Sequence, residues 1–217
     1  MSAIAEYRQE ALRRLFPDIR VIHVPALYDR KDPWYSYKLI SLYKAVEEVS
    51  LPGAFIELGV YRGRCARFLS KFLFGGRKLY LLDSFKGLPE DWVGIWKKGA
   101  FSMLPDEIPV FDSPDIYVIP GWFKDTVPLL AQELQEPLAF IHVDADLYSS
   151  TRDALDALNA HIVPGTIILF DEYFMILEKE FSDDEHRALL DWCREYGREF
   201  EYLWRTEWVQ VAIRITK

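Results

Sequence analysis

Short apolar runs alternate with amphipathic stretches along the chain from residue 51 onward. Apolar residues spaced three or four apart predict helices, and short continuous apolar runs bounded by turn residues predict buried strands. The expected helices cover residues 63–73, 123–134, 149–161 and 183–196. The expected strands cover residues 54–59, 78–83, 116–119, 138–143, 166–170, 200–204 and 208–215.

This order of elements indicates an α/β fold. Nearly continuous apolar strands that alternate with helices are typical of a parallel sheet covered by helices on both faces. The last two runs, 200–204 and 208–215, are joined by a short turn rather than by a helix. We therefore predict a seven-stranded, mostly parallel sheet with an antiparallel hairpin at one edge.

The first 50 residues follow a different pattern. Residues 2–15 and 36–49 each carry an apolar stripe at helical spacing, and residues 17–34 hold three prolines. We expect two helices joined by an irregular covering segment. The predicted organisation is therefore an N-terminal helical cap segment over residues 1–50 and a main domain over residues 51–217.

One long stretch of the main domain, residues 85–114, lacks both periodicities. It contains several glycines and prolines together with Trp92, Trp96 and Phe101. Long loops of this kind are usually functional lids or disordered segments. The aromatic residues favour a lid.

Two runs that should be neighbouring parallel strands end in acidic residues. One is followed directly by Asp144, with Asp146 two positions later, and the other by Asp171 and Glu172. Because the carboxyl ends of parallel strands meet at one sheet edge, these four carboxylates should gather where open α/β sheets bind ligands. Clustered carboxylates repel one another unless a cation or a shared proton is present. The spacing therefore indicates a site for a hard divalent ion such as Mg²⁺.

Less specific interpretations exist for the same residues. Asp146 or Ser149 could instead cap the helix that begins near residue 149. We favour metal binding over capping for Asp144 and Asp171. His142, which lies within the strand, is interpreted as a hydrogen-bonded core residue rather than as a ligand.

A glycine turn follows the first strand of the main domain. It begins at Glu57 and carries Gly59 and Gly63, after which a helix is expected. Asp83 ends the next strand, at the position where an acidic residue commonly binds ribose hydroxyl groups. The turn reads GxxxG and lacks the GxGxxG pattern that admits a pyrophosphate, so a nucleotide-like ligand without phosphate fits better. An ordinary strand-to-helix turn and a turn aspartate are the alternative interpretations.

The strand over residues 116–119 leads into Gly121, Trp122 and Phe123 at the same sheet edge. Either aromatic ring could lie on an adenine face. Placement of both rings in the core is an equally good interpretation of these residues alone.

Composition and charge argue against several classes of protein. The net charge of −8 argues against a general nucleic-acid binder, because phosphate binding needs clustered Lys and Arg. The chain has two cysteines, Cys65 and Cys193, in no CxxC pattern, which is typical of a reduced, cytoplasmic protein. No apolar run is long enough for a membrane span, and the charged N-terminus does not resemble a signal peptide. We therefore expect a cytoplasmic protein without a membrane partner.

Taken together, these motifs resemble the macrocin O-methyltransferase family, the TylF-like enzymes that methylate sugar or aromatic hydroxyl groups of natural products. The matching segments are residues 57–63, 83–89, 121–126, 142–151 and 171–173. They occur in the order found in the family and extend over most of the chain after residue 50. The resemblance implies the Rossmann-like fold of class I S-adenosylmethionine-dependent methyltransferases, with bound Mg²⁺.

The resemblance also implies a role for each matched residue. The implied cofactor-binding residues are Glu57, Gly59, Val60, Tyr61, Gly63, Asp83, Ser84, Phe85, Gly121, Trp122 and Phe123. The implied metal ligands are Asp144, Asp171 and Glu172, and Asp146 matches the position of the general base. We take Asp144 and Asp146 as the catalytic pair. The family typically has two aspartates where this chain has Asp171 and Glu172, which puts its metal geometry in question.

The resulting hypothesis is an O-methyltransferase that uses S-adenosylmethionine and Mg²⁺ to methylate a small hydroxylated molecule. A homodimer is compatible with the aromatic loops and N-terminal helices. One alternative is a non-catalytic module that binds S-adenosylmethionine. A nucleotide-dependent oxidoreductase is a weaker alternative, because the GxGxxG pattern is missing.

Overall fold

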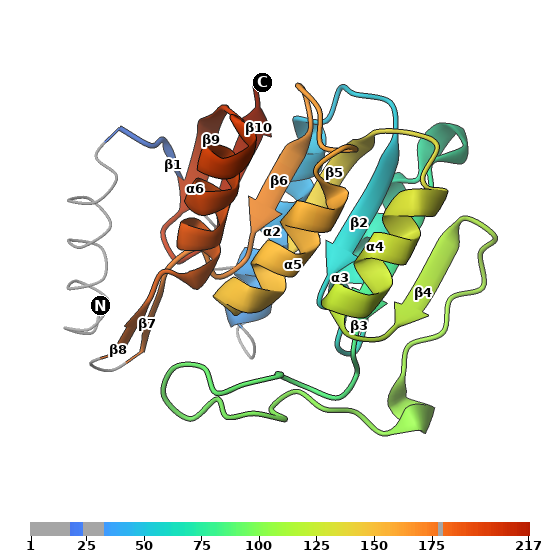
Figure 1. Ribbon diagram of the computed structural model, residues 1–217, viewed down its shortest axis with the longest axis vertical. Helices are drawn as coiled ribbons and strands as arrows, with labels where there is room; N and C mark the ends of the chain where they lie inside the picture. Colours follow the sequence, from blue (N-terminus) through green and yellow to red (C-terminus); the bar gives the residue numbers. More distant parts are fainter. Residues whose placement is uncertain (1–17, 24–32, 178–179) are drawn as a thin grey trace.

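The structure is a computed structural model, which describes residues 18–23, 33–177 and 180–217. The helix predicted over residues 2–15 lies outside these residues. Figure 1 shows one sheet with helices on both of its faces. Within the described residues, no helix is both long enough and apolar enough to cross a membrane.

The main sheet has eight strands in the order β1-β9-β10-β6-β5-β2-β3-β4. Strand β10 runs antiparallel to its neighbours β6 and β9, and the other pairs are parallel. The strands are β1 (Val21–Ile22), β2 (Ala54–Leu58), β3 (Leu79–Asp83), β4 (Ile116–Pro120), β5 (Leu138–Val143), β6 (Ile167–Phe170), β9 (Phe200–Thr206) and β10 (Val211–Ile215). The predicted α/β class and the mostly parallel sheet are confirmed.

The predicted sheet has one strand too few. The additional strand, β1, pairs with β9, so the β9–β10 hairpin does not form the sheet edge. A two-residue strand in a proline-containing segment is too short to show any periodicity. The sequence also gave no sign of the small separate hairpin formed by β7 (Met175–Leu177) and β8 (Glu180–Ser182).

Five described helices cover the sheet. They are α2 (Pro33–Glu47), α3 (Arg64–Leu69), α4 (Phe123–Glu133), α5 (Tyr148–Leu158) and α6 (Asp184–Tyr196). Figure 1 places α4, α5 and α6 on one face, with α2 and α3 behind the sheet. The helix predicted over residues 63–73 is shorter than expected, because α3 ends at Leu69 and a 3₁₀ turn over Ser70–Phe72 follows it.

Each face of the sheet has its own apolar core. On one face, side chains of α4, α5 and α6 pack on the sheet, among them Leu130, Leu155 and the fully buried Trp192. On the other face, residues of α2 and α3 such as Leu42 and Leu69 pack against strand residues. With both faces buried, the strands need continuous apolar sequences, which is the pattern observed.

The parallel strands all end at one edge of the sheet. The chain leaves β2 toward β3 on one side, while β5 pairs with β2 on the other side. This reversal of strand order creates the crevice in which doubly wound folds bind ligands. In Figure 1 the long loop between β3 and β4 crosses below this edge.

Gly59 lies where β2 and β5 end side by side. Its φ is +93°, a conformation that favours glycine, and a Cβ atom there would lie 1.8 Å from the carbonyl oxygen of Asp144. The backbone of Asp144 therefore occupies the space that a side chain at position 59 would need. The cofactor contact implied for Gly59 stays a prediction.

We predict that Gly59→Ala destabilises the protein far more than Gly76→Ala. Gly76 also has positive φ, at +76°, but a Cβ atom there would meet nothing within 4 Å. The Gly76 variant should lose about 1–2 kcal/mol from the left-handed backbone alone. The Gly59 variant should lose about 1–3 kcal/mol more from overpacking. Urea unfolding measures both losses, and equal values would contradict this account of the β2–β5 junction.

Candidate functional site

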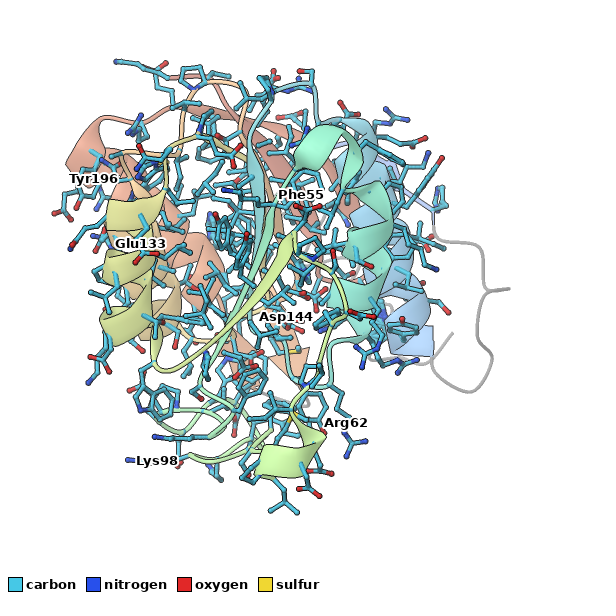
Figure 2. The ribbon with its side chains drawn as sticks, turned by 90° about the vertical axis from the view of Figure 1, so that its right-hand side faces the viewer. Phe55, Arg62, Lys98, Glu133, Asp144 and Tyr196 are labelled. Carbon is cyan, nitrogen blue, oxygen red and sulfur yellow. The ribbon has the colours of Figure 1, made fainter. Side chains whose placement is uncertain are left out.

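A cavity of about 990 Å³ lies at the carboxyl ends of the central strands. The sequence-predicted residues that line it are Glu57, Gly59, Val60, Tyr61, Asp83, Ser84, Trp122, Phe123, Asp144, Asp146 and Glu172. In Figure 2, Asp144 lies between Phe55 in the core and the loop that carries Lys98. The cavity therefore brings together motifs that are more than 100 residues apart in the sequence.

Asp83 fixes the shape of the glycine turn. Its Oδ2 accepts hydrogen bonds of 2.8 Å from the backbone N–H groups of Val60 and Tyr61. Its Oδ1 accepts a 2.7 Å bond from the N–H of Phe85. A carboxylate has about four acceptor positions, so Asp83 retains capacity for a hydroxyl group of a ligand.

Three predicted cofactor residues do not line the cavity. Phe85 is 4% exposed, and its side chain packs in the core formed with α2 and α3. A Cβ atom on Gly63 would lie 2.9 Å from Pro109, so this glycine leaves room for the long loop. A Cβ atom on Gly121 would lie 2.5 Å from Cγ2 of Thr126 in α4. These residues shape the turns that surround the cavity.

Several residues at the cavity have left-handed backbone conformations. Tyr61, Phe101 and Asp146 line it with φ values of +46°, +66° and +63°. Such conformations cost of order 1–3 kcal/mol and persist where the surrounding structure enforces them, often at functional sites. The positive φ at Asp146 also departs from strand geometry, so the alternation of side chains in β5 does not continue to this residue.

The predicted metal ligands do gather. Strands β5 and β6 are parallel and pair Val143 with Phe170, which places Asp144 beside Asp171 and Glu172. Oxygen atoms of these three carboxylates all lie within 4.8 Å of one another. Oε2 of Glu172 is buried and has no hydrogen-bond partner among the described residues. Oxygen ligands of this kind, with one unsatisfied atom, fit a divalent ion such as Mg²⁺.

Lys38 of α2 also reaches these carboxylates, which we had not anticipated. Its Nζ lies 2.8 Å from Oδ2 of Asp144, 2.5 Å from Oδ2 of Asp171 and 3.8 Å from Oε1 of Glu172. Burial alone would lower the pKa of Lys38, but the neighbouring carboxylates outweigh it and raise that pKa well above the usual value. The side chain therefore stays positively charged.

The position of Lys38 along α2 is a signal that sequence reasoning overlooked. Lys38, Leu42 and Ala45 follow helical spacing, and the latter two are fully buried. A lysine on the buried stripe of a helix needs an acidic partner.

Asp146 lies at the cavity wall, partly buried. Burial, followed by the charge of Asp144, raises the pKa of Asp146 to about 8. A carboxylate whose pKa is raised in this way accepts a proton more readily than an ordinary aspartate.

Glu185 in the first turn of α6 connects the two acidic turns. Its Oε1 accepts a 3.3 Å hydrogen bond from the N–H of Ala145, and its Oε2 accepts a 3.2 Å bond from the N–H of Glu172. Burial and the nearby carboxylate of Asp146 raise the pKa of Glu185 well above its ordinary value. Like Lys38, it lies on the apolar face of its helix, with Leu189 and Trp192.

His142 is a partnered core residue, as predicted. It is fully buried, and its Nδ1 lies 3.2 Å from Oε1 of Glu57, which is also buried. Burial would lower the pKa of His142, but the Glu57 carboxylate outweighs this effect and raises it. The pair joins β5 to β2, and Glu57 lines the cavity.

The segment predicted as a lid lies against the cavity. Leu88 and Trp92 form a small apolar cluster with Leu147 and Met175. The indole Nε1 of Trp92 donates a hydrogen bond of 3.4 Å to Oγ of Ser182 in β8. The loop thus closes one side of the cavity by packing on the elements that follow the acidic turns.

Comparison with known proteins adds independent information. The family model of the macrocin-O-methyltransferases (TylF) matches residues 37–101 and 110–189. Demethyldecarbamoylnovobiocin O-methyltransferase of Streptomyces niveus is 30% identical over 177 residues, which cover 71% of this chain and 66% of that protein. A tetracenomycin 4'-O-methyltransferase of Streptomyces olivaceus is 29% identical over 178 residues, which cover 69% of this chain and 67% of that protein. The name of its substrate includes a dimethoxy-rhamnosyl group. The chain thus matches about two thirds of the length of these relatives.

Among solved structures, the O-methyltransferase NovP is similar over 98% of both chains, with a TM-score of 0.67 and 20% identity. This likeness confirms the Rossmann-like methyltransferase fold. The family model covers well over half of the chain, including the glycine turn, Asp83 and both acidic turns. The chain belongs to the TylF family of macrocin O-methyltransferases.

Proposed function

We propose that this protein transfers a methyl group from S-adenosylmethionine to a hydroxyl group of a small natural-product or sugar-like molecule, with Mg²⁺ bound at Asp144, Asp171 and Glu172. One observation carries the proposal. A single cavity is lined both by the glycine turn with Asp83, here called the donor end, and by the acidic turns after β5 and β6, here called the acceptor end. A donor and an acceptor can therefore lie next to each other in it.

The donor end has the features that S-adenosylmethionine needs. Asp83 offers remaining acceptor positions for ribose hydroxyl groups, and Trp122 and Phe123 line the same cavity near the end of β4. The turn lacks a pyrophosphate-binding glycine pattern, which agrees with a cofactor without phosphate groups. Bound there, the sulfonium would supply the methyl group.

The acceptor end must orient a hydroxyl group and remove its proton. Methyl transfer forms a C–O bond, breaks the S–C bond and releases the hydroxyl proton. Asp146 is the residue that we assign to accept this proton, because it lines the cavity and its pKa is raised to about 8. When bound, Mg²⁺ would fix the acceptor oxygen and lower the pKa of its hydroxyl group.

The lining of the acceptor end and the names of the relatives support the proposed substrate class. The cavity presents aromatic rings, including Tyr35, Trp96 and Trp208, beside charged groups. Such a lining suits a hydroxylated molecule with an apolar ring. The relative from Streptomyces olivaceus is named as a 4'-O-methyltransferase of a compound that carries a dimethoxy-rhamnosyl group, which supports a sugar-like acceptor.

We expect the protein to bind S-adenosylhomocysteine and to methylate at least one acceptor in a panel of glycosides and vicinal diols. Calorimetry measures the binding, and transfer of a radiolabelled methyl group measures the activity. Activity should disappear with excess chelator and return with Mg²⁺. Undiminished activity under chelation would refute the role of the metal, and tight binding without transfer would favour a non-catalytic module.

We predict that Asp146→Asn lowers kcat by about 10²–10⁴-fold, because the proton acceptor is lost. Affinity for S-adenosylhomocysteine should stay within about twofold, because Asp146 does not contact the donor in this assignment. Asp153→Asn is a matched control, since Asp153 lines the same cavity on α5. Equal losses of kcat in the two variants would contradict a specific role for Asp146.

Glu185→Gln tests how the acidic turns are held. An amide can accept at one position only, so either Ala145 or Glu172 would lose the acceptor of its N–H group. We expect a loss of about 1–3 kcal/mol in the free energy of unfolding. Glu195→Gln on the exposed side of the same helix should change it by less than about 0.5 kcal/mol. Urea unfolding compares the two variants, and a Glu185 variant as stable as the control would rule out this role.

A further inference from the structure

The ammonium group of Lys38 lies at the centre of the three carboxylates assigned to the metal. Its Nζ is within 2.8 Å of two of them, and all three offer oxygen atoms within 4.8 Å of one another. We propose that Lys38 is a tethered cation which holds the metal position in the ion-free protein and which a divalent ion must displace in order to bind. This inference rests on the proposed function, because that function places the ion here.

The two cations cannot share the site. Mg²⁺ needs oxygen atoms at about 2.0–2.1 Å, so it would occupy the space between the same carboxylate oxygens. The lysine ammonium is a compact point charge, already in direct contact with Asp144 and Asp171. Two positive charges at such a short distance repel each other, so binding of one requires the other to leave.

Lys38 replaces a divalent ion only incompletely. It contacts Asp144 and Asp171 closely, but Oε1 of Glu172 remains 3.8 Å away and its Oε2 has no hydrogen-bond partner among the described residues. One positive charge also balances only part of the charge of three carboxylates. A divalent ion would bring twice the charge and could reach the third carboxylate. It would therefore stabilise the three carboxylates more than the lysine ammonium does.

The cavity offers space for the displaced side chain of Lys38. Lysine carries its charge on a flexible four-carbon stem, and Lys38 itself lines the cavity. After displacement the ammonium can move into the cavity without unfolding α2. Competition by a group of the same chain lowers the apparent affinity for metal. The carboxylates would therefore need a higher concentration of the ion for half-saturation than they would without Lys38.

Substitution of Lys38 tests the competition directly. Mn²⁺ serves as the probe, because electron paramagnetic resonance measures its free concentration, and Mg²⁺ can compete for the same site. Lys38→Met should bind Mn²⁺ at least tenfold more tightly than the unaltered protein. Lys44→Met is the matched control on the same helix, since Lys44 is exposed and pairs with Glu47. Unchanged or weaker binding by the Lys38 variant, or no binding by any of these proteins, would overturn the proposal.

A second experiment uses the unaltered chain, in case Lys38→Met does not fold. Acetylation with an N-hydroxysuccinimide ester, read by peptide mass spectrometry, reports whether each amine is accessible. Lys38 should be protected without divalent ions and should react at least fivefold faster in saturating Mg²⁺. Lys44 should react equally under both conditions. Equal protection of Lys38 with and without bound ion would refute displacement.

These measurements are independent of catalysis. Neither needs S-adenosylmethionine or an acceptor, so a failed acceptor screen leaves them interpretable. Conversely, methyl transfer that depends on Mg²⁺ in a protein whose Lys38 variant binds Mn²⁺ no more tightly would preserve the proposed function and eliminate the tethered cation.

Discussion

The pairing of β5 with β6 forces like charges together, and much of the site can be understood as a response to that constraint. The register places Asp144 beside Asp171 and Glu172. Carboxylates this close are stable only with a counter-charge or with protons bound. Lys38 provides a positive charge from a helix on the far side of the sheet, and burial with the neighbouring Asp171 raises the pKa of Glu172.

The surrounding residues hold this charged cluster in a defined shape. Glu185 accepts hydrogen bonds from backbone N–H groups in both acidic turns, which fixes the turns relative to each other. The left-handed backbone conformation at Asp146 interrupts the strand alternation, and the residue lines the cavity. The residue assigned as proton acceptor, Asp146, lies two positions after Asp144 in the sequence, and the charge of Asp144 contributes to its raised pKa.

Much of the fold was predictable because strand and helix periodicities are local properties of the chain. The seven long strands and the gathering of the acidic turns follow from them, whereas the two-residue β1 carries no local signal. The site was predictable only where motifs lie at strand ends. Lys38 and Glu185 were missed, because their partners are chosen by three-dimensional packing and their charged side chains lie on otherwise apolar helix faces. The cytoplasmic location and a homodimer stay predictions.

The junction of β2 and β5 connects the two halves of the cavity. The backbone N–H of Asp144 donates a 2.8 Å hydrogen bond to the carbonyl of Leu58, and the Asp144 carbonyl packs against Gly59. The turn assigned to the methyl donor and the first carboxylate assigned to the acceptor side therefore share one backbone contact. In-line methyl transfer depends on a small, fixed distance between donor and acceptor atoms. Because this contact directly follows the last residues of two paired strands, the sheet itself can set that distance.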